Sequence, residues 1–160
     1  FHAGHNHLIQ TAIKECNQVI VFTSLKDREI IKGHRMFKVW QDLIIPLLPS
    51  YVEVHPVRSP VGSVYEYLEH YGMATQSYRI YGGTEDIGRL SEARMIQYYP
   101  HLNVVNVAES HPESYTRDVI HAKGEWVRNS IQAGNLKEFK SYLPAFLKPL
   151  AKEYLSILVD

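Results

Sequence analysis

The 160-residue sequence lacks several features, and each absence excludes a class of protein. Its one cysteine, Cys16, cannot form a disulfide within the chain, which fits a reducing compartment such as the cytoplasm. The 17 basic and 17 acidic side chains leave no net charge, so composition gives no reason to expect a nucleic-acid or membrane partner. No apolar run approaches the roughly 18 residues of a membrane-spanning helix. These absences favour a soluble, cytoplasmic, single-domain protein that is long enough to bury a core.

Helical and β-rich patterns alternate along the chain. The helical patterns cover about 5–16, 34–48, 60–71, 84–98 and 120–133. Short β-rich runs separate them, and they cover 18–24, 51–57, 77–81 and 101–107. This order predicts one α/β domain with right-handed crossovers and a mostly parallel sheet that has helices on both faces. We expect the domain to span 1–134 and to carry a C-terminal helical tail, 135–160, split by Pro144.

The first nine residues place histidines on either side of a glycine at the start of the first helix. A helix that begins near His5 directs its unpaired N–H groups and the positive end of its dipole toward an anion over Gly4. His2 and His5, one turn apart, would both donate hydrogen bonds to such an anion. Histidine is also common at helix starts, so the pattern alone leaves a purely structural interpretation equally open. A zinc site of His2, His5 and His7 is disfavoured, because His7 points elsewhere and no Cys or acidic residue lies near.

The stretch Phe-His-Ala-Gly-His-Asn-His-Leu-Ile resembles the H-x-G-H motif of the nucleotidyltransferase superfamily, which includes nicotinamide-nucleotide and pantetheine-phosphate adenylyltransferases and the cytidylyltransferases. The resemblance implies a Rossmann-like fold in which His2 and His5 hold the nucleotide phosphates, beside Phe1 and Gly4. It implies transfer of a nucleotidyl group from an NTP to a small phosphorylated acceptor, with Mg²⁺ on the phosphates and release of pyrophosphate. Adenylyl transfer from ATP to nicotinamide mononucleotide, giving NAD, is the favoured reaction, and cytidylyl transfer is the alternative.

A glycine-rich turn extends the resemblance. The residues Tyr-Gly-Gly-Thr-Glu-Asp at 81–86, followed by Arg89, are similar to the family's fourth-strand segment. By that resemblance Gly82 and Gly83 let the nucleotide approach, and Asp86 and Arg89 orient the nucleotide or the acceptor. A strand-to-helix turn also requires glycine for backbone reasons alone, and taken by itself the segment favours that simpler interpretation.

The segment 123–129 lies where the family has a Ser-x-Thr-x-x-Arg motif. The resemblance places Arg128 on the triphosphate and Lys123 on the leaving pyrophosphate. Lys123 and Glu125 replace the family's hydroxyl residues, and Glu125 repels a triphosphate unless Lys123, Arg128 or magnesium pairs with it. This departure motivates an alternative of another class, a nucleotide-binding or structural subunit that has lost catalysis.

Smaller matches are similar to bacteriophage-encoded members of the family, which would act in the host cytoplasm; they lie at 26–28, 40–49, 59–61 and 139–144. The chain begins inside the motif, without the strand that the resemblance places before it. A parallel sheet without its central strand leaves unpaired backbone, so we expect further residues upstream, with a processed chain as the alternative. The aromatic-rich tail and the 11 tyrosines are compatible with a homo-oligomer and equally with burial in the protein's own core.

Overall fold

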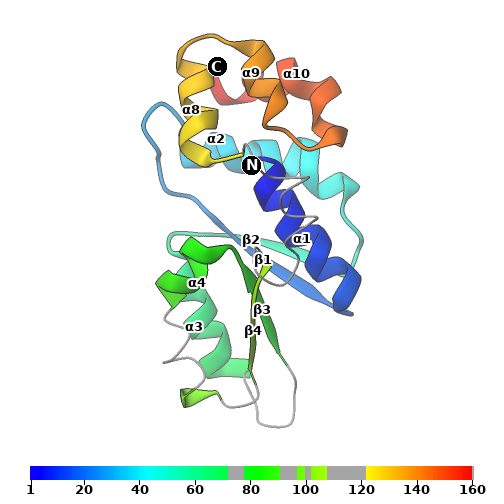
Figure 1. The fold of residues 1–160 in the computed structure, drawn as a ribbon, viewed down its shortest axis with the longest axis vertical. Coiled ribbons are helices and arrows are strands. Elements are labelled where there is room, and N and C mark those ends of the chain that lie inside the picture. The colour runs from blue at the N-terminus through cyan, green and yellow to red at the C-terminus, as the bar shows by residue number, and fades with distance from the viewer. Residues whose placement is uncertain (72–77, 91–96, 100–101, 108–121, 160) are drawn as a thin grey trace.

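The computed structural model describes residues 1–71, 78–90, 97–99, 102–107 and 122–159. It confirms a mixed α/β fold with parallel strands (Figure 1). Within these ranges no helix combines the length and the apolar character that crossing a membrane requires. Between the last predicted strand and the helix predicted from residue 120 the sequence is polar and contains Pro112, which predicts a surface loop at 108–119; these residues lie outside the described ones.

The helices follow the predicted order. They are α1 (Ala3–Glu15), α2 (Gly33–Val39), α3 (Pro60–Tyr71), α4 (Thr84–Leu90), α8 (Gly124–Gln132), α9 (Leu136–Ser141) and α10 (Ala151–Val159). Helix α2 continues through a π-helical turn, Trp40–Ile44, and a 3-10 turn, Ile45–Leu47, and ends at an extended Leu48 before Pro49. Helix α8 begins at Gly124 rather than at residue 120, because Lys123 before it has extended backbone.

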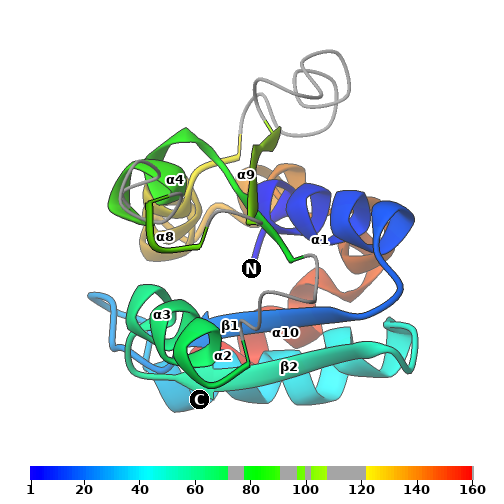
Figure 2. The same cartoon turned by 90° about the horizontal axis from the view of Figure 1, so that it is seen from below.

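The strands form two small parallel sheets. Strand β1 (Val19–Ser24) pairs with β2 (Val52–Val57), and β3 (Arg79–Gly82) pairs with β4 (Asn103–Asn106). The register runs from Val19 opposite Val52 to Ser24 opposite Val57 in the first sheet. The sequence predicts one continuous sheet, whereas the two pairs form separate sheets that lie apart in Figure 2, and among the described residues no strand hydrogen-bonds to both. Within each pair, every strand forms hydrogen bonds along only one of its two edges. A continuous sheet would need a strand that hydrogen-bonds to both pairs through the edges that are left.

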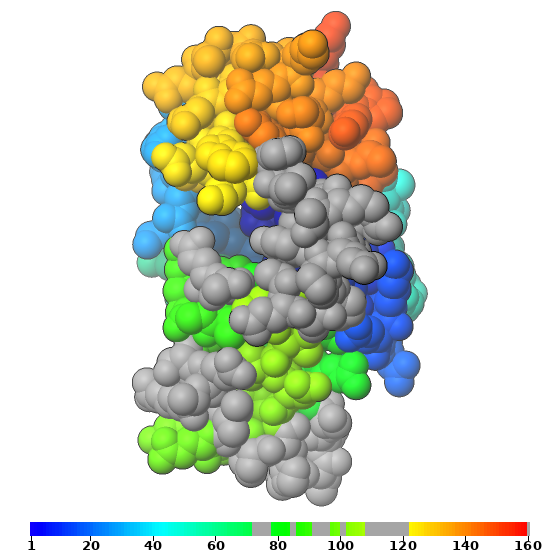
Figure 3. Space-filling model, in the orientation of Figure 1, coloured from blue at the N-terminus to red at the C-terminus, as the bar shows by residue number. Residues whose placement is uncertain are grey.

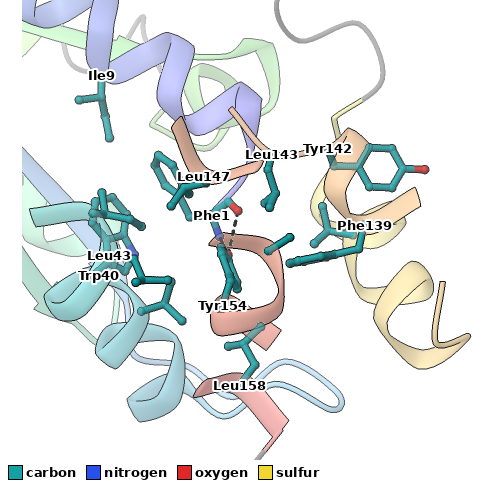
Figure 4. Packing of buried hydrophobic residues seen from close by; sticks show 14 residues of the cluster. Phe1, Ile9, Trp40, Leu43, Phe139, Tyr142, Leu143, Leu147, Tyr154 and Leu158 are labelled. Carbon is teal, nitrogen blue, oxygen red and sulfur yellow. Dashed lines mark hydrogen bonds between the residues drawn. The ribbon is translucent and has the colours of Figure 1, made fainter. Parts of the chain in front are cut away.

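The buried apolar residues form two clusters. The larger one joins α1 and α2 to the C-terminal tail, where Phe139, Leu147 and Tyr154 are almost completely buried (Figure 4). The tail therefore packs back on its own domain, which is one of the two roles that its aromatic residues allow. The smaller cluster lies between α3 and α4 and contains Leu68, Ile87 and Leu90. Each sheet thus has its own apolar support.

The charged segment 25–33 is predicted to be a loop; the structure has a loop over 25–32, and Gly33 already begins α2. The Oδ1 atom of Asp27 accepts a hydrogen bond from the Gly33 N–H at 2.9 Å. A Cβ atom at Gly33 would lie only 1.8 Å from the Leu25 carbonyl oxygen, so only glycine fits where the loop meets the helix. The loop follows the carboxyl end of β1, the edge at which open α/β sheets bind ligands.

Candidate functional site

His2 forms the N-cap of α1. Its Nδ1 atom accepts a hydrogen bond from the Gly4 N–H at 3.0 Å, and the Ala3 N–H donates to the Tyr142 carbonyl oxygen at 2.8 Å. The helix therefore begins at Ala3 and not near His5. The sequence predicts that the first N–H groups of the helix are free to bind an anion. Two of them, those of Ala3 and Gly4, already have acceptors inside the protein, so the prediction of a fully open helix terminus is wrong.

The rings of His2 and His5 stack on each other. Their centroids are 3.9 Å apart and their planes differ by 22°. Because His2 Nδ1 accepts a hydrogen bond, we assign the ring hydrogen of neutral His2 to Nε2, which leaves Nε2–H as its remaining donor. Spacing alone predicts that the two side chains lie one turn apart, and the structure brings them together in this way.

Both histidines are held in the neutral form. Burial lowers the pKa of His2 to about 3. Burial and the adjacent His2 lower the pKa of His5 as well, although more of His5 than of His2 is exposed to solvent. Near neutral pH the pair can therefore donate hydrogen bonds to a phosphate without carrying charge.

Gly4 makes room for the His2 ring. A Cβ atom at this position would lie 2.8 Å from Cε1 and 3.0 Å from Nδ1 of His2, and 3.6 Å from the Ala122 carbonyl oxygen. The glycine is thus required for the packing of the histidine itself, whereas the sequence interpretation assigned it to the approach of a triphosphate. The contact with Ala122 also places the residues that lead into α8 beside the start of α1.

Phe1 belongs to the core and anchors the residue that follows it. Its ring packs edge-on against Trp40, with centroids 5.0 Å apart. The Tyr154 hydroxyl donates to the Phe1 carbonyl oxygen at 2.8 Å and accepts from the Phe1 nitrogen at 2.9 Å (Figure 4). Phe1 therefore fixes the position of His2 from behind, and its direct contact with a nucleotide stays a prediction.

Arg128 has a partner that sequence reasoning missed. Its Nε atom lies 3.6 Å from Oε2 of Glu29, and the side chain is 25% exposed. Lys123 places its Nζ atom 5.1 Å from the centroid of the Trp126 ring, and Glu125 is exposed. The carboxylate near Arg128 is therefore Glu29 and not Glu125. The only sequence signal for Glu29 is its place in the charged loop after a strand's carboxyl end.

The glycine-rich turn connects β3 to α4. A Cβ atom at Gly82 would meet Ile87 Cδ1 at 3.1 Å, whereas one at Gly83 would meet no atom within 4 Å. Arg89 forms an exposed ion pair with Asp86 at 3.6 Å, within the helix. Figure 3 shows a hollow between α8, in yellow, and α4, in green, with blue N-terminal residues at its back.

A second, open groove is formed by residues of α8 and α9. It has a volume of about 550 Å³ and is lined by Trp126, Asn129, Glu138, Ser141 and Tyr142. Among the described residues, no group of three His, Cys, Asp or Glu side chains is placed to hold a metal ion. Comparison of the chain with protein-family models, curated protein sequences and solved structures gave no match. The interpretation of the site therefore depends on its own residues and their geometry.

Proposed function

We propose that this protein is a nucleotidyltransferase, which transfers a nucleotidyl group from an NTP to a phosphate-bearing acceptor and releases pyrophosphate. The favoured reaction is adenylyl transfer to nicotinamide mononucleotide, with cytidylyl transfer as the alternative. The observation that supports it most is the stacked, neutral pair of His2 and His5 beside the residues that lead into α8. Two neutral donors next to a helix that carries Arg128 suit a polyphosphate.

In this reaction a phosphate oxygen of the acceptor attacks the α-phosphorus of the nucleotide in line. The new P–O bond forms as the bond between the α-phosphorus and the bridging oxygen breaks, and pyrophosphate leaves without a covalent enzyme intermediate. The His2 Nε2–H and the His5 ring donate to the α- and β-phosphates, and Arg128 attracts the departing pyrophosphate. Catalysis is then a matter of position and charge stabilisation. Mg²⁺ would accompany the NTP and bind mainly its phosphate oxygens.

A second candidate is a nucleotide-binding subunit without catalysis. It is favoured by the two N–H groups of α1 that already have acceptors and by the carboxylate of Glu29 beside Arg128. Both features reduce what the site offers to a triphosphate. This candidate binds ATP and releases no pyrophosphate.

The experiment is a pyrophosphate-release assay with Mg²⁺ that crosses ATP and CTP against nicotinamide mononucleotide, phosphopantetheine and glycerol phosphate. We expect release with one pair, which identifies both the base and the acceptor. The matched variants are His2→Asn and, as a control, His34→Asn at an exposed position of α2. Asn keeps an N-cap acceptor but removes the Nε2–H donor, so His2→Asn should fold and lose on the order of 100-fold in turnover.

The outcomes separate the candidates. Full turnover by His2→Asn contradicts the histidine mechanism. Silence across the panel from folded protein that binds ATP supports the binding subunit. Silence together with no ATP binding contradicts both candidates.

A further inference from the structure

Glu29 occupies a backbone position that usually belongs to glycine. Arg28 and Ile31 exchange two backbone hydrogen bonds of 2.8 Å each, so Glu29 and Ile30 are the central residues of a tight hairpin turn. Glu29 has φ = 50°, and of the described non-glycine residues it alone has a positive φ. A two-residue turn with positive φ only at its first central position favours glycine there. A glutamate is retained in this strained position, so we expect its side chain to make an interaction that glycine could not make.

The carboxylate of Glu29 compensates the charge of Arg128 but does not accept a hydrogen bond from the Arg128 Nε–H group. The distance of 3.6 Å between Oε2 and Nε exceeds that of a hydrogen bond. The Arg128 Nε atom is buried, and within the described part of the chain it has no hydrogen-bond partner. Glu29 itself is 59% exposed at its side chain, so water competes for its carboxylate. An anion that reaches Nε with better geometry therefore has an advantage over Glu29.

We infer that Glu29 competes with phosphate ligands for Arg128. In the free protein the Glu29 carboxylate forms an ion pair with Arg128, and a polyphosphate displaces this carboxylate when it binds. The inference rests on the proposed function, because it takes Arg128 as the residue that binds pyrophosphate or the triphosphate. A ligand must exchange with Glu29, so the carboxylate lowers the affinity for every anion at Arg128. Glu29 thereby selects ligands with enough charge and acceptor oxygens to replace it, which pyrophosphate has and a single carboxylate lacks.

The test is the binding of pyrophosphate by titration calorimetry to the full chain and to Glu29→Gln. Removal of one exposed carboxylate should strengthen binding about fivefold, since such ion pairs contribute up to roughly 1 kcal/mol. The matched control is Glu153→Gln, which removes an exposed carboxylate from the first turn of α10 and should change affinity less than about twofold. Glu29→Gly removes the same charge with the residue that the turn favours, so it should act like Glu29→Gln.

The double variant Glu29→Gln, Arg128→Gln identifies the path of the effect. If Glu29 acts through Arg128, the gain from Glu29→Gln disappears when Arg128 is already replaced. The inference is overturned if Glu29→Gln binds pyrophosphate no better than the original chain, or if its gain persists without Arg128. Either result leaves the proposed function standing when the original chain binds pyrophosphate. Absence of binding by every folded variant overturns the proposed phosphate site together with this inference.

Discussion

The substitution Gly4→Ala should disable the histidine pair while it leaves the fold intact. The new Cβ atom would lie 2.8 Å from His2 Cε1, closer than such atoms pack. The Ala122 carbonyl oxygen lies 3.6 Å from the same Cβ atom, an ordinary contact distance, so the clash is with the His2 ring alone. The His2 ring must therefore rotate, which breaks both its hydrogen bond to the Gly4 N–H and its stack on His5.

Two opposing terms set the stability of this variant. Loss of the N-cap hydrogen bond costs about 1 kcal/mol. Replacement of glycine by alanine inside a helix gains up to about 1 kcal/mol, and less in the first turn. The free energy of unfolding should therefore change by less than about 1 kcal/mol, whereas turnover should fall on the order of 100-fold through the misplaced donor.

Urea denaturation and the pyrophosphate-release assay measure these two quantities separately. The control is Gly88→Ala in α4, where a Cβ atom meets nothing within 4 Å, so it should stabilise by up to about 1 kcal/mol and leave turnover unchanged. Full turnover by stable Gly4→Ala would refute the requirement for the stacked pair. A loss above about 3 kcal/mol would show that the backbone moves instead of the His2 ring.

Two further predictions concern the residues around the pair. The unfolded chain protonates His2 near its ordinary pKa of 6.5 and the folded protein only near about 3. The unfolded state therefore binds more protons in this window, so stability is full above pH 6.5 and falls as pH drops toward 3, by on the order of 1 kcal/mol per pH unit. Urea denaturation between about pH 7.5 and about pH 5 should show this slope, and His2→Asn should reduce it to the part that His5 contributes. Tyr154→Phe leaves the buried Phe1 carbonyl oxygen without the Tyr154 donor and should cost about 2 kcal/mol in thermal or urea unfolding; the exposed Tyr51→Phe should cost less than about 0.5 kcal/mol, and equal losses would contradict the role of the Tyr154 hydroxyl.

Much of the fold can be predicted from the sequence because the apolar pattern is local. The β-branched run at 19–24 and the alternation at 52–57 give strands at the predicted places. Ser59 caps α3 through its hydrogen bond from Gly62, as Ser-Pro at a helix start predicts. The separation of the sheet into two pairs could not be predicted in this way, because pairing depends on contacts between residues far apart in the chain.

The candidate site was predictable only in part, for a similar reason. The spacing of His2 and His5 places them on one helix turn, and their stack follows from that. No pattern in the sequence shows that His2 caps its own helix, since the acceptor is a ring nitrogen and not the hydroxyl, carboxylate or amide oxygen of Ser, Thr, Asp or Asn. The ion pair of Glu29 with Arg128 joins positions almost a hundred residues apart, and no local rule connects them.

The two apolar clusters differ greatly in size, and this difference has a consequence for how the molecule opens. Among the described residues, the larger cluster has 14 buried members and the smaller one between α3 and α4 has three. Less buried surface means a lower free energy of local opening. The backbone amides of β3 and β4 should therefore exchange with deuterium through local fluctuations. Those of β1 and β2 should exchange only through global unfolding. A ligand bound between α8 and α4 would link the part of the molecule around the larger cluster to the part around the smaller one. It should therefore slow the deuterium exchange of β3 and β4.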